Sequence, residues 1–250
     1  REARAMSRLS SPHTVRVHYC GQSGSHLYLA MELLVGTPLD VILKPGRLPW
    51  RRALRMILQI CDSLGEAHRF GVVHRDLKPE NIIIVADTPT EDFVKVLDFG
   101  LAKIQGGSDP YTVESQLDVF GTPFYMSPEQ VLSGTIDHRT DMYALGSMAF
   151  QLLTGQHVFS SHKSTFEMLS AHVSLPPPTV AETIPSAGIP QVISDIVGSL
   201  LEKEPDSRIQ TMQALALALQ NALDDNPDVA DVPAMREGET PDDGPRTRTY

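Results

Sequence analysis

Apolar residues recur at helical spacing along much of this chain. The clearest stripe lies within residues 49–70 and consists of Leu54, Ile57, Leu58, Cys61, Leu64 and His68. It predicts an amphipathic helix that Gly71 ends, since glycine readily adopts positive φ. Further helices are expected over residues 39–43, 141–154, 165–173, 191–201 and 211–223. The 141–154 pattern is apolar on nearly every side, so that helix is expected to be buried.

Short runs of β-branched and aromatic residues predict strands. Residues 15–20 and 27–32 are expected to form two strands joined by a hairpin-type turn at residues 21–24. The run Ile-Ile-Ile-Val at residues 82–85 predicts a third strand, and residues 93–97 predict a fourth after a polar turn. All four strands therefore fall within the first hundred residues.

Length and composition allow a substantial hydrophobic core. The chain has 250 residues, of which 41% are hydrophobic and 21% charged, which is typical of a globular protein with one or two domains. No apolar run reaches the ~18 to 20 residues that cross a bilayer, and the charged first residues do not resemble a signal peptide. Cys20 and Cys61 each lie in an apolar pattern, which favours buried thiols in a reducing compartment over a disulfide.

The formal net charge of −10 argues against a nucleic-acid partner. About half of it comes from residues 224–250, which hold eight acidic and three basic residues and four prolines. A segment this polar and poor in large apolar groups is expected to be a disordered linker. The rest of the chain is only mildly acidic.

Residues 74–81 concentrate groups suited to proton and phosphate chemistry. The carboxylate of Asp76 can accept a proton from a hydroxyl, and Lys78 can neutralise a phosphate oxygen. Asn81 can offer a carbonyl oxygen to Mg²⁺, and Asp98 supplies a second hard-oxygen ligand. We expect these side chains to converge on one site.

The same residues resemble the signature motifs of protein kinases. H-R-D-L-K-P-E-N at residues 74–81 is similar to the catalytic loop, D-F-G at residues 98–100 to the magnesium motif, and S-P-E at residues 127–129 stands in place of A-P-E. The resemblance implies an α+β, protein-kinase-like fold with a mostly α large lobe and a truncated β small lobe. The run G-T-P-x-Y-M-S-P-E-Q with an acidic tail is most similar to bacterial Ser/Thr kinases.

This resemblance implies ATP- and Mg²⁺-dependent phosphoryl transfer to Ser/Thr hydroxyls of protein substrates. It makes Asp76, Lys78 and Asn81 catalytic, with Asn81 and Asp98 holding the metal. Lys78 and Thr122 together favour a Ser/Thr rather than a tyrosine kinase.

Nucleotide binding is expected at residues 31–36, which resemble the family's link between the two lobes. There the backbone of Glu32 and Leu34 would hold adenine, and Ile83 would form the floor of its pocket. Glu2 aligns with the glutamate of the family's αC helix, although its partner lysine is absent. The alternatives are that Met31 and Leu34 are ordinary core residues and that Glu2 is a solvated surface residue.

Residues 101–120 resemble an activation segment. Arg75 would meet a phosphate there, on Thr112 or Ser115, and the choice between the two stays open. A simple salt bridge of Arg75 is the alternative. Autophosphorylation through a contact between two kinase chains also remains open.

Two structural roles follow from the resemblance. Asp141 would tie down the backbone of the catalytic loop, and Arg208 would pair with Glu129. The implied organisation is a small-lobe remnant at residues 1–35, a large lobe at 36–223 and the linker at 224–250.

The sequence given contains no glycine-rich phosphate loop, and its first lysine is Lys44. Because it opens at Arg1 in a helix-like pattern, we interpret it as a fragment that is inactive or nearly so by itself. The parent protein is expected to be an active cytoplasmic kinase, and a membrane tether beyond residue 250 stays open.

Two rival functions come from other classes. A noncatalytic, pseudokinase-like scaffold usually lacks catalytic-loop or D-F-G residues, whereas Asp76, Asn81 and Asp98 are all present. A small-molecule phosphotransferase would share the aspartate and asparagine spacing, but Arg75 and the run at residues 121–129 favour a protein substrate.

Overall fold

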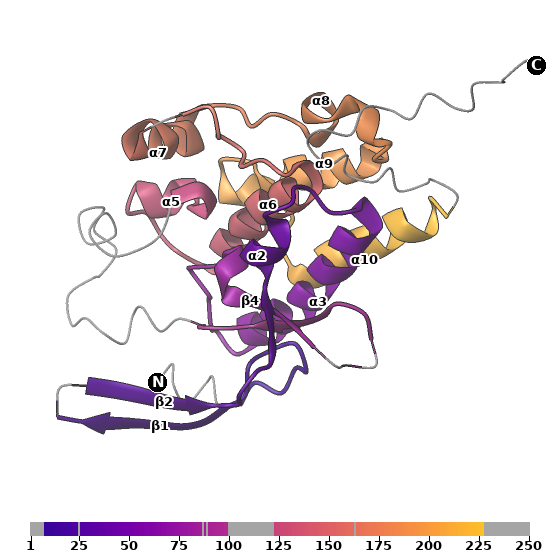
Figure 1. Cartoon of the computed structure of the whole chain (residues 1–250). Helices are drawn as coiled ribbons and strands as arrows, with labels where there is room; N and C mark the ends of the chain where they lie inside the picture. Colours follow the sequence, from indigo (N-terminus) through magenta and orange to yellow (C-terminus); the bar gives the residue numbers. More distant parts are fainter. Residues whose placement is uncertain are drawn as a thin grey trace, which may run out of the picture.

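The computed structural model describes residues 8–24, 26–86, 88, 90–99, 123–162 and 164–227. The helix expected at the start of the chain and most of the expected linker lie outside these residues. Within them, a hairpin and a small sheet stand beside a larger helical body, with the hairpin projecting at the lower left of Figure 1.

The hairpin consists of β1 (Val17–Ser23) and β2 (His26–Met31), which pair antiparallel. The predicted turn at residues 21–24 is wrong, because Gly21 lies within β1 and pairs with Tyr28. Glycine marked a turn in the sequence, yet only Gly24 adopts the left-handed conformation, with φ of +60°. The strands therefore run further toward the tip than expected.

The second sheet has the order β3-β4-β5 and is antiparallel, with β3 at Gly36–Pro38, β4 at Ile82–Val85 and β5 at Phe93–Val96. The strand predicted at residues 82–85 is confirmed. β3 was not predicted, since three residues show no periodicity and become a strand only by pairing. Val15, expected to begin the first strand, instead donates its N–H to the carbonyl of Val96 (2.9 Å).

Helices form most of the remaining described chain. The longer ones are α3 (Trp50–Arg69), α6 (His138–Thr154), α7 (Thr165–Ser174), α9 (Gln191–Leu200) and α10 (Met212–Asp224). The short ones are α2 (Leu39–Leu43), α5 (Pro128–Val131) and α8 (Val180–Thr183), with 3₁₀ turns η1 (Pro79–Asn81), η3 (Pro123–Tyr125), η4 (Pro185–Ala187) and η5 (Pro205–Ser207). No described helix is long and apolar enough to span a membrane.

The start predicted for α6 is wrong by three residues. The helix begins at His138 because the side chain of Asp137 accepts the N–H of Arg139 (2.8 Å) and caps it. The other predicted helices are found within about two residues of their expected ends. α5 and α8 were missed, although Ser127 with Gln130 and Thr179 with Glu182 form capping boxes that signal a helix start.

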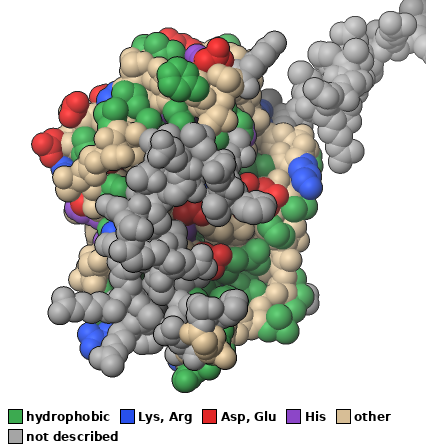
Figure 2. Space-filling model, turned by 90° about the vertical axis from the view of Figure 1, so that its left-hand side faces the viewer, with side chains coloured by type: hydrophobic (Ala, Val, Ile, Leu, Met, Phe, Trp, Pro, Cys, Tyr) green, Lys and Arg blue, Asp and Glu red, His purple; other side chains and the backbone are tan. Residues whose placement is uncertain are grey.

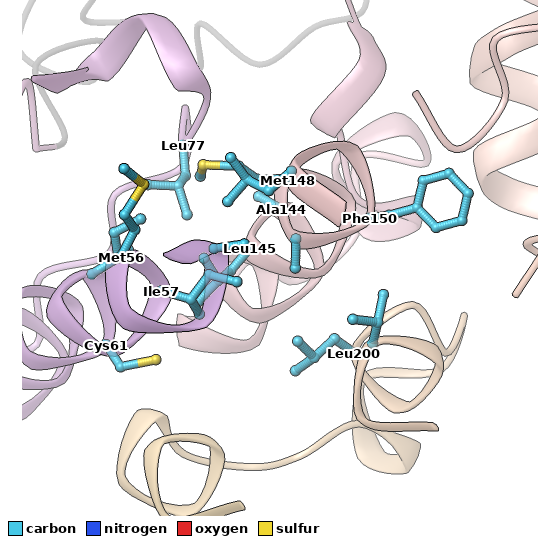
Figure 3. Packing of buried hydrophobic residues seen from close by; sticks show 14 of the residues in the cluster. Met56, Ile57, Cys61, Leu77, Ala144, Leu145, Met148, Phe150 and Leu200 are labelled. Carbon is cyan, nitrogen blue, oxygen red and sulfur yellow. The ribbon is translucent and has the colours of Figure 1, made fainter. Parts of the chain in front are cut away.

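The core is centred on α6, which is buried along almost its whole length as expected. α3 packs against one side of it and α9 against another, while α10 covers α3 and α9. Figure 3 shows Ile57 of α3 beside Leu145 of α6, with Leu200 of α9 on a different side of α6. This helical body is the rigid base from which the loop at residues 74–81 emerges.

The segment after residue 8 is fastened to α3 by polar contacts. The carboxylate of Glu66 accepts the N–H of Ser10 (2.8 Å), its hydroxyl (2.6 Å) and the N–H of Ser11 (2.7 Å). The hydroxyls of Thr14 and Ser63 are 2.7 Å apart and buried. These bonds hold the entry to β1 against the helical body.

Candidate active site

The loop at residues 74–81 is held between two rigid elements. α3 ends at Arg69, and Gly71 follows with φ of +73°, as the sequence predicted. Pro79 then opens η1, because proline has no N–H to satisfy at a helix start, and β4 begins directly afterwards. The intervening residues need no regular structure and are free to present side chains.

Three predicted site residues are in contact on this loop. The ammonium of Lys78 lies 2.8 Å from the carboxylate of Asp76. The amide nitrogen of Asn81 donates to the backbone carbonyl of Asp76 (2.7 Å) and, more weakly, to its carboxylate (3.3 Å). The Asp76 side chain is 56% exposed, so its carboxylate is open to a molecule from solvent. This arrangement can orient a hydroxyl and neutralise nearby negative charge.

Asp98 lies beside Asn81 because their strands are neighbours. β4 and β5 pair with Ile82 opposite Val96, and the N–H of Leu97 donates to the carbonyl of Asn81 (2.9 Å). Asp98 is the next residue and adopts a left-handed conformation with φ of +55°. The two side chains thus belong to adjacent strand ends.

These two residues suit a hard cation. Since the amide nitrogen of Asn81 is used toward Asp76, its oxygen remains as the possible ligand. A carboxylate and an amide oxygen fit Mg²⁺, which is usually held by one or two protein groups together with substrate phosphates. No group of three or more His, Cys, Asp or Glu that could hold a metal occurs among the described residues, but such a site does not require one.

Asp141 anchors the start of the loop from the first turn of α6. Its carboxylate accepts the N–H of His74 (2.8 Å) and of Arg75 (2.8 Å), and lies 2.7 Å from Nε2 of His68. The side chain is fully buried, and burial by itself would raise its pKa. Its contacts with His68 and His74 outweigh burial and leave the pKa below its ordinary value, so the group stays ionised.

His74 links the loop to the D-F-G segment. Its Nε2 donates to the carbonyl of Leu97 (2.8 Å), which leaves Nδ1 to accept weakly from the N–H of Asp76 (3.4 Å). Its ring lies 4.9 Å from that of Phe99, which is buried. The histidine therefore has both nitrogens and its ring face in structural contacts.

Arg75 carries backbone strain, with φ of +69° in a residue other than glycine. Besides the bond to Asp141, its carbonyl accepts the side-chain amide of Gln130 on α5 (2.8 Å). Strain held by contacts on both sides is common at functional sites. Its expected partners Thr112 and Ser115 lie outside the described residues, as does Thr122.

Glu129 and Arg208 are in direct contact. The guanidinium of Arg208 binds both carboxylate oxygens (2.8 and 2.7 Å) and donates further to three backbone carbonyls. Thr140 donates its hydroxyl to the same carboxylate (2.8 Å). The ion pair joins α5 to the segment between α9 and α10.

The expected adenine-binding segment, residues 31–36, has open backbone groups. No backbone hydrogen bond within the described residues uses the carbonyl of Glu32 or the N–H of Leu34. Ile83 is half-buried on β4, and β4 pairs with β3, which begins at the last residue of this segment. Glu2 lies outside the described residues, so its expected position remains a prediction.

Sequence reasoning missed the contacts of three polar residues. His68 was predicted only as part of the apolar stripe of α3 and not as a partner of Asp141. Gln130 was not singled out, although its capping-box pattern was readable. Lys95 was also missed. It ion-pairs with Glu32 (2.6 Å), and nothing in the local pattern of β5 signals this.

Comparison with known proteins identifies relatives along most of the chain. The sequence profile of a family described as protein kinase domain matches residues 1–219. The chain is 39% identical to serine/threonine-protein kinase pkn3 of Myxococcus xanthus over 88% of its length, and 36% identical to PknH of Mycobacterium tuberculosis over 90%. It spans only 41% and 34% of those two relatives.

A solved structure shares the fold. The Mycobacterium tuberculosis PknI kinase domain, in a variant form, matches with a TM-score of 0.67 at 23% identity, covering 88% of this chain and 75% of that one. At this identity the likeness bears on the fold alone. It confirms the fold class predicted from the motifs.

Proposed function

Because the chain belongs to the protein kinase family, we propose that the protein containing it transfers the γ-phosphoryl group of ATP to Ser and Thr hydroxyls of protein substrates. The observation that carries this proposal is the contact of Asp76 with both Lys78 and Asn81 beside the strand end that bears Asp98. The names of the relatives, serine/threonine-protein kinases, support the same substrate class.

Asp76 is the proposed general base. Its exposed carboxylate would accept a hydrogen bond from the substrate hydroxyl, orient it toward the phosphorus and take up its proton. Lys78, 2.8 Å away, would lie against the oxygens of the transferred group. Its positive charge then opposes the negative charge that spreads over those oxygens in the transition state.

Asn81 and Asp98 would hold Mg²⁺. A bound Mg²⁺ would supply positive charge that reduces the negative charge of the phosphate groups. The hydrogen bond from Asn81 to Asp76 supports this proposal, because it would hold the proposed base and one proposed metal ligand in a fixed relation. The protein thus contributes mainly positioning and charge, as phosphoryl transfer requires.

The nucleotide would lie against residues 31–36. The open carbonyl of Glu32 and N–H of Leu34 can receive the donor and acceptor edges of adenine, and Ile83 can contact its face. Glu2 would belong to the same site. We also propose that Arg75 receives a phosphate carried on Thr112 or Ser115, with Thr122 toward the protein substrate.

We further propose that residues 1–35 belong to the small lobe, 36–223 to the large lobe and 224–250 to a linker. A catalytic region that uses ATP is expected to face the cytoplasm.

Residues 1–250 alone should be inactive or nearly so. They contain no glycine-rich loop and no lysine before Lys44, and a single electrostatic contact to a reacting group contributes roughly 10²- to 10³-fold in rate. Purified residues 1–250 should be assayed beside the full-length protein. Comparable phosphoryl transfer by both would contradict this part of the proposal.

The proposal as a whole is tested with Asp76→Asn in the full-length protein. Transfer of labelled phosphate from ATP to a Ser- and Thr-containing protein should fall by roughly 10²- to 10⁴-fold, as expected for loss of a general base. Nucleotide binding should persist. Asp195→Asn, at an exposed carboxylate on α9, is the matched control and should retain activity. Unchanged transfer in Asp76→Asn, or a noncatalytic wild type that only binds partners, would overturn the proposal.

A further inference from the structure

Three separate segments of the chain meet at the side chain of Lys95 on β5. Its ammonium lies 2.6 Å from the carboxylate of Glu32 and donates to the carbonyl of Thr14 (3.2 Å). The Lys95 side chain is only 14% exposed, and that of Glu32 is 28% exposed. This ammonium is partly buried and has two oxygen partners. It therefore differs from solvent-exposed ion pairs, which contribute little to stability.

Glu32 is fixed from both its side chain and its backbone. Its carboxylate also accepts the N–H of Arg16 (2.8 Å), and its own N–H donates to the carbonyl of Arg16 (2.9 Å). Burial tends to raise the pKa of Glu32, but the bonds from Lys95 and Arg16 lower it overall. The carboxylate therefore stays charged, whereas the carbonyl of Glu32 accepts no backbone hydrogen bond within the described residues.

Lys95 also lies next to the other parts of the proposed site. The register of β4 and β5 puts Lys95 directly opposite Ile83, and opposed residues project from the same face of an antiparallel pair. Asp98 follows Lys95 by three residues, about 10 Å of extended chain. One side chain thus connects the segment proposed for adenine to the strand that ends at the proposed metal ligand.

We propose that Lys95 is a positioning residue for the nucleotide. It holds Glu32 so that the carbonyl of Glu32 meets adenine at a fixed distance from Asp98, without touching the nucleotide itself. This inference rests on the proposed kinase function and adds to it a determinant of nucleotide affinity. It predicts an effect on binding of ATP that is separate from the chemistry at Asp76.

The test uses Lys95→Met in the full-length protein, which keeps the volume of the side chain and removes the charge. The KM for ATP and the Kd of a nonhydrolysable ATP analogue should both rise about tenfold, equivalent to about 1.4 kcal/mol. The kcat should stay within about twofold, and the KM for the protein substrate should not change. A merely structural role would lower the melting temperature and the active fraction but leave the KM for ATP unchanged.

Companion variants make the outcome specific to the ion pair. Lys95→Arg keeps the charge and should remain near wild type, while Glu32→Gln should raise the KM for ATP as Lys95→Met does. The double variant should be no worse than either single one, because both remove the same contact. Lys44→Met, at an exposed lysine after α2, is the control for loss of one positive charge and should change nothing.

The results separate this inference from the proposed function. An unchanged KM for ATP in Lys95→Met, with an active wild type, would overturn the positioning role alone. A wild type that binds no nucleotide would overturn the kinase proposal and this inference together. If Lys95→Met does not fold, Glu32→Gln decides the matter, since an unchanged KM there would equally refute the role of the pair.

Discussion

Arg208 and Glu129 form a bidentate ion pair in the interior, although 79 residues separate them in the sequence. The Arg208 side chain has no exposed surface, and its guanidinium also lies over the ring of Tyr143, with 5.0 Å from its central carbon to the ring centroid. Every donor of the pair has a partner, which is the condition under which buried charges are tolerated. The pair joins the chain after η3 to the segment before α10.

Breaking this pair should be costly. Glu129→Gln leaves a buried guanidinium without its counter-charge, so the free energy of unfolding should fall by about 3 to 5 kcal/mol. Urea unfolding followed by circular dichroism measures the change. Asp206→Asn is the matched comparison, because that carboxylate also contacts an arginine, Arg139, but is 92% exposed. A similar loss in both variants would contradict the importance of burial.

Acid should destabilise the protein through its buried carboxylates. Burial opposes ionisation of Glu129, but its bonds to Arg208 keep its pKa below the ordinary 4.5, and Asp141 is likewise lowered from 3.8. As pH falls, the unfolded chain takes up these protons before the folded protein does. The two carboxylates therefore contribute their full stability above their ordinary pKa values, and this contribution is lost as pH falls through their lower pKa values in the folded protein. Urea midpoints measured from pH 7 to 3 should drop below about pH 4.5, and the drop should be shallower in Glu129→Gln.

Asp141→Asn should loosen the catalytic loop. The N–H of His74 donates to Oδ2 of Asp141 and that of Arg75 to Oδ1, so an amide NH₂ in place of either oxygen leaves one of the two N–H groups without its acceptor. We expect a loss of about 3 kcal/mol in stability and faster hydrogen exchange at these two amides. Asp137→Asn keeps an oxygen able to cap α6 and should leave that exchange unchanged. Slow exchange at both amides in Asp141→Asn would show that the anchor is not needed.

Gly146 should not tolerate a side chain. A Cβ at this position of α6 would lie 2.6 Å from the Cβ of Leu200, so Gly146→Ala forces α6 and α9 apart and should cost about 1 to 3 kcal/mol. At Gly198, in α9, a Cβ meets nothing within 4 Å. Gly198→Ala should therefore stabilise the protein by about 0.5 to 1 kcal/mol through helix propensity. Thermal melts of the two variants should shift in opposite directions.

Local patterns were sufficient for the long helices and for the candidate chemistry. The apolar spacing within α3 and α10, and the positive φ at Gly71, depend on residues a few positions apart, so they can be read without the fold. The residues around Asp76 and Asp98 were found as motifs for the same reason. Errors arose where a residue had two local options, as at Gly21, which could have been a turn but pairs with Tyr28.

The sequence by itself determined the helix periodicity, the family and the side chains able to do chemistry. Only the tertiary structure decided which distant groups meet, such as Lys95 with Glu32 and Glu66 with Ser10. The physical reason is that a charge or hydroxyl shows its type in the sequence but not its partner. Packing around α6 excludes water from the polar groups that it buries. Each of these groups must then form hydrogen bonds with the groups that the fold places beside it, and this determines its partner.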